Sequence, residues 1–304
     1  MSFDQGLILV AISAYIVAML ALFNYLLTRG ELAKRIGIPF AALGCAVQFA
    51  ELVYRDLSSG IWPLTNLYGS LSLFAAMSVA IFIGFALRYD LWFMGGFVLA
   101  LATGFLAYGL TWDEGYLPAV PALQSYWIKI HVPLVISAYA SFLVAFVSSL
   151  LYLIKYFGER ALAPALAAAA PAPRSIIVGD SPNLERAAAA GNTMALWLAT
   201  LPSLLKLDII TYRIIAIGLP LLSLGIITGA WWAKEAWGQY WQWDPKETAA
   251  LVSWVVYALY MHLHTRTAWR GLRSAWIVVF GFATIIFCYL GVNIWISGEH
   301  SYKT

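Results

Sequence analysis

The sequence predicts an all-α polytopic membrane protein with about eight transmembrane helices and both termini on the extracytoplasmic side. Of the 304 residues, 62% are hydrophobic and 11% are charged, with a mean hydropathy of +0.79. Soluble domains carry about 25% charged residues, so this much apolar surface requires a membrane as its solvent. Helices are expected because the period-two alternation of a membrane β-barrel is missing.

The expected spans are uninterrupted apolar stretches of about 20 residues, enough to cross about 30 Å of hydrocarbon as a helix. In chain order they cover residues 6–27, 36–54, 68–87, 91–112, 130–154, 214–233, 248–263 and 275–297. We do not expect the first span to be a signal peptide, because no cation precedes Arg29 and no small-residue cleavage site follows.

Positive charges give the expected orientation of these spans. The loops after the first, third, fifth and seventh spans hold twelve Lys and Arg residues, whereas the loops and tail on the other side hold five. This bias places the odd-numbered loops in the cytoplasm. The formal net charge of +3 is too small to indicate nucleic-acid binding.

Three parts follow along the chain. Residues 1–156 carry the first five spans, 157–206 form a cytoplasmic linker rich in Ala and Pro, and 207–304 carry the last three spans with an outer loop at 231–247. Within the linker, 161–173 is low in complexity and expected to be flexible. Residues 193–205 predict either a short interfacial helix with Trp197 at headgroup level or a disordered tether.

Several classes of chemistry are excluded. Cys45 and Cys288 each lie inside an apolar stretch, which argues against a disulfide framework, a CxxC centre or a CxxCH haem attachment site. Phosphate-binding GxxxxGK[ST] and dinucleotide-binding GxGxxG motifs are missing from the sequence. Thiol chemistry would therefore have to come from another molecule.

Tryptophans are concentrated in the loop after the sixth span. Trp62, Trp92, Trp112 and Trp127 fit an aromatic belt at the membrane interface. The loop holds five of the fourteen tryptophans, and an anchoring belt needs only one or two per helix end. These five flat side chains suit stacking on a large planar apolar ligand. They are Trp231, Trp232, Trp237, Trp241 and Trp243.

The end of this loop predicts the start of the seventh helix. Asp244 is expected as N-cap, Pro245 as the first helical residue and Glu247 as the third, closing a capping box. A purely capping role and a functional role for Asp244 are about equally favoured. The positive end of this helix could also receive a carboxylate, with Lys234 or Lys246 as counter-charge.

Four histidines fall on two sides of the membrane. His131 and His300 are expected at the outer ends of the fifth and eighth spans, on the side of the tryptophans, whereas His262 and His264 lie near the inner end of the seventh. A histidine near a bilayer is a functional candidate, although an interfacial side chain bonded to water remains an alternative for each.

The inner pair cannot share one site. His262 and His264 are about 200° apart on a helix; His264 continues the stripe of Tyr257 and Tyr260, and His262 continues an apolar face. His264 lies roughly 25 Å of helix from Glu247 at 1.5 Å per residue, too far to share a ligand with His131. Paired imidazoles beside aromatic walls are typical of haem iron sites, whereas zinc favours a tighter cluster.

The segment WGQYWQWDPKET at residues 237–248 closely resembles the WWD signature of haem-handling proteins of cytochrome c biogenesis, and its Pro-Lys-Glu ending is similar to the CcsA (ResC) family. Further segments resemble the same family in the same order, so the resemblance covers most of the chain. One departure is Gly69, where relatives often carry Glu. The further segments are 63–68, 207–208 with 212–213, 225–230, 263–266 and 300–302.

The resemblance implies a subunit of the CcsB–CcsA cytochrome c synthase in the bacterial cytoplasmic membrane, with its active site outside. It would move haem b across the membrane with the partner CcsB (ResB) and present it for thioether attachment to CxxCH apocytochrome c. His131 and His300 would ligate the outer haem iron, and His264 an inner haem. Haem would be held by the five tryptophans and positioned for attachment by Trp237, Trp241, Trp243 and Asp244.

Three rival functions stay open. The shorter CcmC and longer CcmF proteins also carry WWD loops, although length and the Pro-Lys-Glu ending favour CcsA. The second rival is a haem transporter without ligase activity, and the third is a b-type haem electron-transfer subunit. An electron-transfer subunit requires facing histidine pairs inside the bundle, for which this chain supplies one suitable buried histidine.

Overall fold

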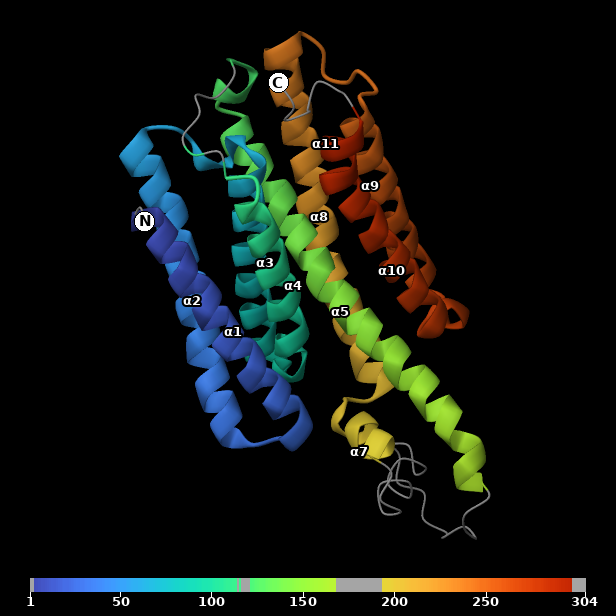
Figure 1. Ribbon diagram of the computed structural model, residues 1–304. Helices are drawn as coiled ribbons and strands as arrows, with labels where there is room; N and C mark the ends of the chain where they lie inside the picture. Colours follow the sequence, from blue (N-terminus) through green and yellow to red (C-terminus); the bar gives the residue numbers. More distant parts are fainter. Residues whose placement is uncertain (1–2, 114, 116–120, 168–192, 297–304) are drawn as a thin grey trace.

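In a computed structural model the protein is a bundle of long helices (Figure 1). The structure describes residues 3–113, 115, 121–167 and 193–296. Short 3-10 turns lie at η1 (Pro63–Thr65), η2 (Trp92–Met94), η3 (Pro121–Gln124) and η4 (Thr267–Trp269). The helices are α1 (Phe3–Thr28), α2 (Glu31–Ser59), α3 (Leu67–Tyr89), α4 (Gly95–Leu110), α5 (Ile128–Ala167), α7 (Thr193–Thr200), α8 (Leu204–Trp237), α9 (Pro245–His264), α10 (Leu272–Ile286) and α11 (Val292–Trp295).

Seven helical segments are long and apolar enough to cross a membrane: α1, α2, α3, η2 with α4, α5, α8, and α10 through α11. The multi-pass membrane architecture is therefore confirmed. The predicted seventh span, 248–263, forms as α9, a helix of 20 residues, but it is outside this set. Its first and last turns carry Lys246, Glu247, His262 and His264, which lower its hydropathy. The orientation of the helices stays a prediction.

The helices pack as neighbouring pairs across the bundle. At one edge α1 packs against α2 and α4, in the middle α3 packs against α4 and α5, and beyond them α5 packs along α8 (Figure 1). On the far side α9 and α10 pack against one another. In the core, the Phe142 ring of α5 stacks on the Tyr257 ring of α9 with centroids 3.7 Å apart. Trp92, predicted in an aromatic belt, is instead buried beside Phe82.

The linker between the fifth and sixth expected spans is more helical than the sequence suggested. Helix α5 continues to Ala167, because alanine is the strongest helix former. A short helix, α7, forms at Thr193–Thr200 and buries Ala195 and Leu198, and Lys155 Nζ donates to Leu201 O at 2.8 Å. Much of the Ala/Pro-rich segment, 168–192, lies outside the described residues.

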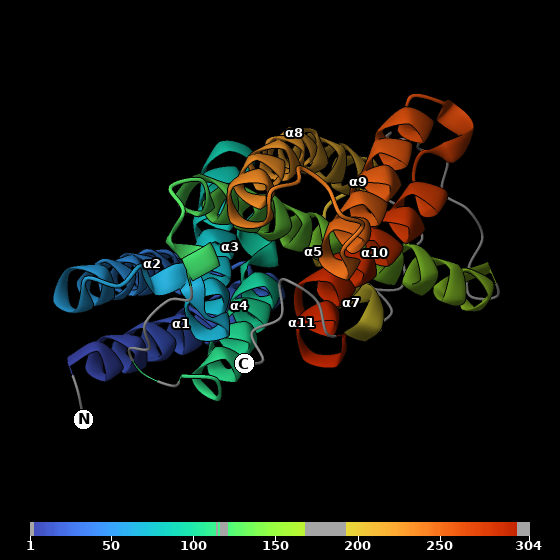
Figure 2. The same cartoon turned by 90° about the horizontal axis from the view of Figure 1, so that it is seen from above.

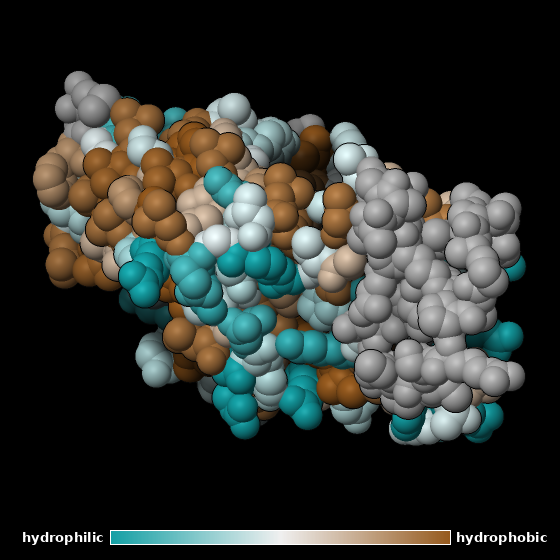
Figure 3. Space-filling model, turned by 90° about the horizontal axis from the view of Figure 1, so that it is seen from below, coloured by the Kyte–Doolittle hydropathy of each residue, from teal (hydrophilic) through white to brown (hydrophobic). Residues whose placement is uncertain are grey.

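The surface supports a membrane environment. Figure 3 views the end of the bundle near α7: hydrophobic side chains cover the flank, while polar side chains gather across the end face. Lipid would contact apolar flanks of this kind, since a bilayer core offers no partners for polar groups.

A buried ionic cluster ties the other end of α2 to its neighbours. Both guanidinium Nη atoms of Arg55 donate to the Asp113 carboxylate at 3.0 and 2.8 Å. Arg55 also pairs with Asp4 of α1 at 2.9 Å and with Glu51 at 2.6 Å. The Tyr68 hydroxyl donates to Glu51 at 2.8 Å, and the Tyr68 ring lies 4.2 Å from the guanidinium carbon. These pairs join α1, α2, α3 and the segment after α4.

Candidate ligand-binding site

A cavity lies at the end of the bundle where α8 connects to α9. Figure 2 views this end from above and shows the connection between the two helices. The cavity has a volume of about 170 Å³. The walls are mostly apolar, with a few polar groups converging on the cavity, as is typical of small-molecule sites. Its lining includes Leu64, Ser70, His131, Tyr139, Gly229, Trp232, Trp237, Tyr240, Trp241, Lys246, Glu247, Cys288 and Tyr289.

His131, in the first turn of α5, is oriented by the backbone of α8. Its Nδ1 lies 2.8 Å from the carbonyl oxygen of Gly225. A carbonyl can only accept, so Nδ1 carries the hydrogen and Nε2 is the ring nitrogen with the lone pair that a metal binds. Gly229 makes this placement possible, because a Cβ there would lie 2.7 Å from His131 Cε1.

Three tryptophans form an aromatic wall beside His131. The Trp232 ring stacks on the imidazole at 5.9 Å and 22°, and the Trp237 ring meets Trp232 edge-on at 4.8 Å. Trp232 is fixed by its indole N–H, which donates to Ala122 O at 2.8 Å. Trp241 also lines the cavity. Three of the five tryptophans therefore line the cavity, and their stacking on a ligand stays a prediction.

The predicted loop at 231–247 is wrong in its first part. Trp231, Trp232 and Trp237 belong to helix α8, which ends only at Gly238, with φ 81° and its N–H bonded to Lys234 O. Trp231 packs against Trp127 at 4.7 Å and is outside the lining. A glycine after the last helical residue, with Lys234 in the last turn, is the sequence signal that identifies this end.

The true connection is short and is held by Glu247. Its Oε2 accepts from Gln242 N at 2.9 Å and Asp244 N at 3.3 Å, and Asp244 Oδ2 accepts from Lys246 N at 2.9 Å. The predicted capping box is confirmed, with Asp244 buried as N-cap. Trp243, between these anchors, adopts φ 58° and is 69% exposed, so it points away from the cavity.

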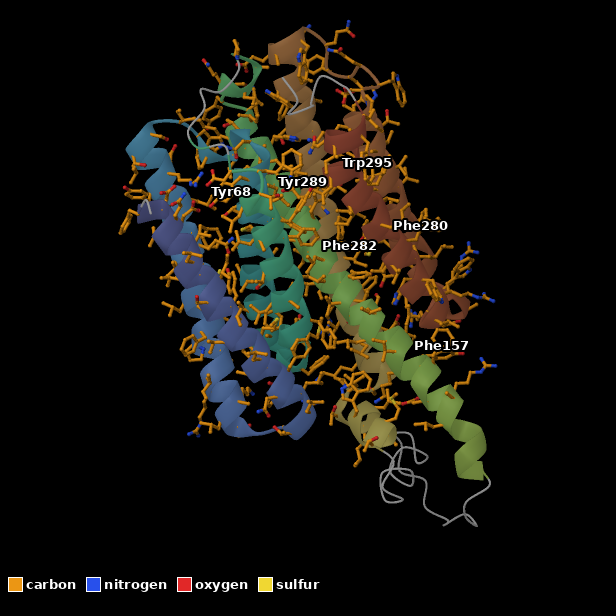
Figure 4. The ribbon with its side chains drawn as sticks, viewed as in Figure 1. Tyr68, Phe157, Phe280, Phe282, Tyr289 and Trp295 are labelled. Atoms are coloured by element: carbon orange, nitrogen blue, oxygen red, sulfur yellow. The ribbon has the colours of Figure 1, made fainter. Side chains whose placement is uncertain are left out.

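The floor of the cavity comes from a π-helical turn, η5 (Phe287–Gly291), between α10 and α11. It places Cys288 and Tyr289 in the lining. The Tyr139 hydroxyl and Cys288 Sγ lie 3.4 Å apart. Tyr289 donates to Ser70 Oγ at 3.0 Å and extends into the bundle between α3 and α5 (Figure 4). Cys288 and Tyr289 were not predicted as lining residues, because no sequence pattern signals a π-helical turn.

Lys246 lines the cavity next to this π-helical turn. Its Nζ donates to Asn293 Oδ1 at 2.8 Å, and Asn293 Nδ2 donates to Tyr289 O at 2.5 Å. Burial lowers the pKa of Lys246 from its ordinary value, an effect partly opposed by the neighbouring Cys288 thiol and Asp244 carboxylate. A lysine beside apolar walls favours an anionic group on a ligand.

The inner histidine has a different environment. His264 is buried at the end of α9, and its Nε2 lies 3.0 Å from Asp208 Oδ2. Its ring stacks on Tyr212 at 4.8 Å and lies 5.5 Å from Tyr260. The other carboxylate oxygen of Asp208 accepts from Gly271 N at 3.1 Å. His264 is outside the cavity lining, so it and His131 belong to separate sites, as predicted.

Burial confirms that His262 and His264 lie on opposite faces of α9. His262 is exposed, as are Val255 and Leu259 on the same face, whereas Tyr257 and Tyr260 are buried with His264. His300 lies outside the described residues, so its pairing with His131 stays a prediction. Within the described part of the chain no cluster of three or more His, Cys, Asp or Glu residues suits a metal ion.

Comparison with known proteins identifies the family to which this chain belongs. A family described as "Cytochrome C assembly protein" matches residues 64–300. The chain belongs to this family. A CcsA protein of Heterosigma akashiwo is 35% identical over 291 residues, covering 92% of this chain and 88% of the relative. A Synechococcus elongatus CcsA protein is 36% identical over 287 residues, covering 88% and 87%.

A further relative and a solved structure also resemble this cytochrome c assembly protein. The Chlamydomonas reinhardtii CcsA protein is 34% identical over 278 residues, with 88% of this chain and 69% of the relative covered. The structure named "Cytochrome c Heme Lyase CcmF" superposes with a TM-score of 0.58 over 94% of this chain, at 16% identity. This chain covers 46% of that larger protein, so the likeness concerns the fold alone.

Gly69, noted as a departure from the family pattern, has a local explanation. A Cβ at this position would lie 1.6 Å from Pro63 O. The Gly69 N–H donates to the N-cap side chain of Asn66 at 2.7 Å. In this cytochrome c assembly protein, glycine therefore lets η1 fold tightly onto the start of α3, which brings Leu64 to the cavity wall.

Proposed function

We propose that this protein binds haem in the outer cavity and, with CcsB (ResB), presents it for attachment to CxxCH apocytochrome c. The observation that carries the proposal is the His131 imidazole: Nδ1 is fixed by Gly225 O at 2.8 Å, which leaves Nε2 to ligate iron beside an indole wall. A backbone carbonyl behind a histidine is the usual second partner of a metal-ligating imidazole.

The rest of the cavity suits a porphyrin. A porphyrin is flat and largely apolar. With iron on Nε2, its plane would cross the imidazole plane, so Trp232, whose ring is 22° from the imidazole, would contact the porphyrin edge. Trp237 and Trp241 supply further apolar surface in the cavity. We propose His300 as the second iron ligand, approaching from the C-terminal tail. Two imidazoles would exclude oxygen from the iron and keep it as Fe(II), the state required for thioether formation.

The attachment reaction requires little covalent help from the protein. Each cysteine sulfur of the apocytochrome bonds to the vinyl carbon next to the porphyrin ring, and the thiol hydrogen goes to the outer vinyl carbon, so that nothing leaves. The protein's part is positioning, which turns a bimolecular step into an effectively unimolecular one. We assign positioning of haem to Trp237 and Trp241, contact with the incoming peptide to the exposed Trp243, and support of the connection to Asp244.

The inner histidine belongs to an earlier step in this proposal. Haem would enter from the cytoplasmic side and meet His264 before it reaches the outer cavity. In the structure His264 Nε2 faces Asp208 at 3.0 Å. Ligation of haem iron by His264 would therefore use Nδ1, or Nε2 after this pair opens. We propose the inner site as a transient stop because His264 lies outside the cavity.

The experiment is an absorption spectrum of the detergent-extracted complex with CcsB, recorded with and without apocytochrome. We expect a bis-imidazole haem spectrum, followed by the band shift of covalent thioethers once apocytochrome is added. His131→Ala should abolish the outer haem bands. A complex without haem bands contradicts the proposal.

Two different outcomes identify the rivals. Haem that is bound and released without forming thioethers identifies a transporter. A spectrum that survives loss of His131 but disappears with His264→Ala identifies a b-type electron-transfer subunit. If His264→Ala lowers stability alone, the inner haem site is wrong.

A further inference from the structure

The cavity contains a pair of hydrogen-bond donors that haem ligation by His131 does not use. Both Lys246 and Trp241 line it. The indole Nε1 of Trp241 is buried and has no hydrogen-bond partner among the described residues. A buried N–H without an acceptor is destabilising, so such a group in a ligand cavity indicates an acceptor on the ligand.

Lys246 is aimed by the residues behind it. Asn293 is 4% exposed, and its Nδ2 is held by Tyr289 O, so its Oδ1 faces the ammonium at 2.8 Å. An ammonium has three N–H donors, and the amide of Asn293 is a neutral acceptor. The contact therefore orients the lysine within the cavity.

The nearby carboxylates of Asp244 and Glu247 hold the connection between α8 and α9. Glu247 Oε2 accepts from Gln242 N and Asp244 N, and Asp244 Oδ2 accepts from the backbone N–H of Lys246. Both carboxylates therefore hold the connection and cap α9. They are directed at backbone N–H groups.

Other cations near this end of the bundle are held by other contacts. Lys234 Nζ donates to Gly238 O at 2.7 Å and lies over the Tyr240 ring, and it is outside the lining. Lys129 lies over the Trp62 ring at 5.5 Å. Of the two counter-charges that the sequence suggested, Lys246 is therefore the one inside the cavity.

We propose that Lys246 and the Trp241 indole N–H form a carboxylate subsite that binds a propionate of the porphyrin. The inference rests on the proposed function and names how the ligand is oriented. The carboxylate would lie at the α9 and η5 side of the cavity, with its oxygens between the ammonium and the indole N–H. A porphyrin anchored by this edge has a defined rotation about the His131–iron axis, which fixes where its vinyl groups lie.

The test compares haem with its dimethyl ester, in which both carboxylates are neutral. The complex of this chain with CcsB is purified in detergent without haem, and the dissociation constant of each ligand is measured by absorbance titration. Wild type should bind haem about 10–100-fold more tightly than the diester, as expected for a hydrogen bond to a charged group. Lys246→Met, of similar length and without charge, should bring this ratio close to one while the affinity for the diester stays nearly unchanged.

Two further variants separate the subsite from general damage to the cavity. Trp241→Phe keeps a ring and removes the N–H, so it should lower the haem-to-diester ratio by about 2–10-fold. Lys234→Met is the matched loss of a lysine outside the cavity and should keep the wild-type ratio. The proposal is overturned if Lys246→Met keeps the wild-type ratio, or if wild type binds both ligands equally.

Failure of the subsite is distinguishable from failure of the proposed function. If wild type binds neither ligand, haem binding itself is wrong. If wild type binds both with His131-dependent spectra but without discrimination, haem binding stands and the carboxylate subsite falls. A loss of diester binding in Lys246→Met, with the ratio unchanged, would mean that the lysine only supports the fold.

Discussion

The two candidate haem histidines are held in opposite ways. His131 at the outer end is oriented through Nδ1 by a backbone carbonyl, so its Nε2 is the nitrogen suited to a ligand beside a cavity. His264 at the inner end has its Nε2 directed to the carboxylate of Asp208. Each imidazole donates through one ring nitrogen, so the lone pair lies on Nε2 in His131 and on Nδ1 in His264. The two differ in place, because His131 lines the cavity and His264 lies outside it. In the proposed function this difference favours His131 as the resting site and His264 as a transit point.

Asp208→Ala should have the largest effect, and on stability. Asp208 accepts from both His264 and Gly271 N and thereby joins α8, α9 and the start of α10. Removing this acceptor leaves the His264 ring N–H and the Gly271 N–H unsatisfied, at a cost of about 1–3 kcal/mol for each buried donor. We expect a clear drop in the melting temperature of the detergent-purified protein, while the outer haem bands keep their shape. Lys34→Ala, which breaks the surface pair with Asp90, should cost less than about 1 kcal/mol.

An equal effect of the two substitutions would contradict a structural role for the inner pair. Loss of the outer haem bands in Asp208→Ala, at temperatures where the protein remains folded, would break the distinction between the two ends.

His131→Ala should have the largest effect on the ligand. Loss of an iron ligand exceeds the 10–100-fold that loss of a partner behind the ligand costs, so haem affinity should fall by more than about 100-fold. The measurement is the absorbance titration with haem, and added imidazole should restore part of the bands. His262→Ala, at the exposed histidine, should leave them unchanged. Wild-type haem affinity in His131→Ala would transfer the resting site to the inner end.

Local sequence signals predicted the features that depend on neighbouring residues. The capping box from Asp244 to Glu247 follows from three adjacent residue types, and the opposite faces of His262 and His264 follow from the helical repeat. Helix ends were less well predicted. The strong helix propensity of alanine favours the continuation of α5 to Ala167. Helix α8 continues beyond the expected end at 233 to Trp237, directly before Gly238.

Features that join distant segments could not be predicted. The bond between His131 and Gly225 O crosses 94 positions of sequence. The pair of His264 with Asp208 crosses 56. Cys288 reaches the cavity through a π-helical turn. Each depends on how helices are placed against one another, which the hydrophobic pattern of a single helix does not determine.

Gly229→Ala tests whether orientation of His131 matters in addition to its presence. The added Cβ would lie 2.7 Å from Cε1 and 2.8 Å from Nδ1 of the imidazole, so the ring must move away from Gly225 O. Loss of the partner behind a ligating histidine costs about 10–100-fold in metal affinity, and haem titration should show a loss in that range. Gly104→Ala on α4 is the control, because a Cβ there meets nothing within 4 Å. Unchanged haem affinity in Gly229→Ala would mean that the backbone contact is incidental.

Asp244→Ala should have the smallest effect and separates the two roles that the sequence left open for this residue. As N-cap, Asp244 accepts from Lys246 N, and its loss should destabilise the start of α9 by about 1 kcal/mol. Trp241 and Lys246 flank this cap, so haem affinity should fall severalfold with it. Asp244→Asn keeps an N-cap oxygen and removes the charge, so it should restore stability and haem affinity together if the residue acts through the fold. Recovery of stability in Asp244→Asn without recovery of thioether formation would contradict the capping role and assign the carboxylate to the attachment step. The outer end would then differ from the inner end in its chemistry as well as in how its histidine is held.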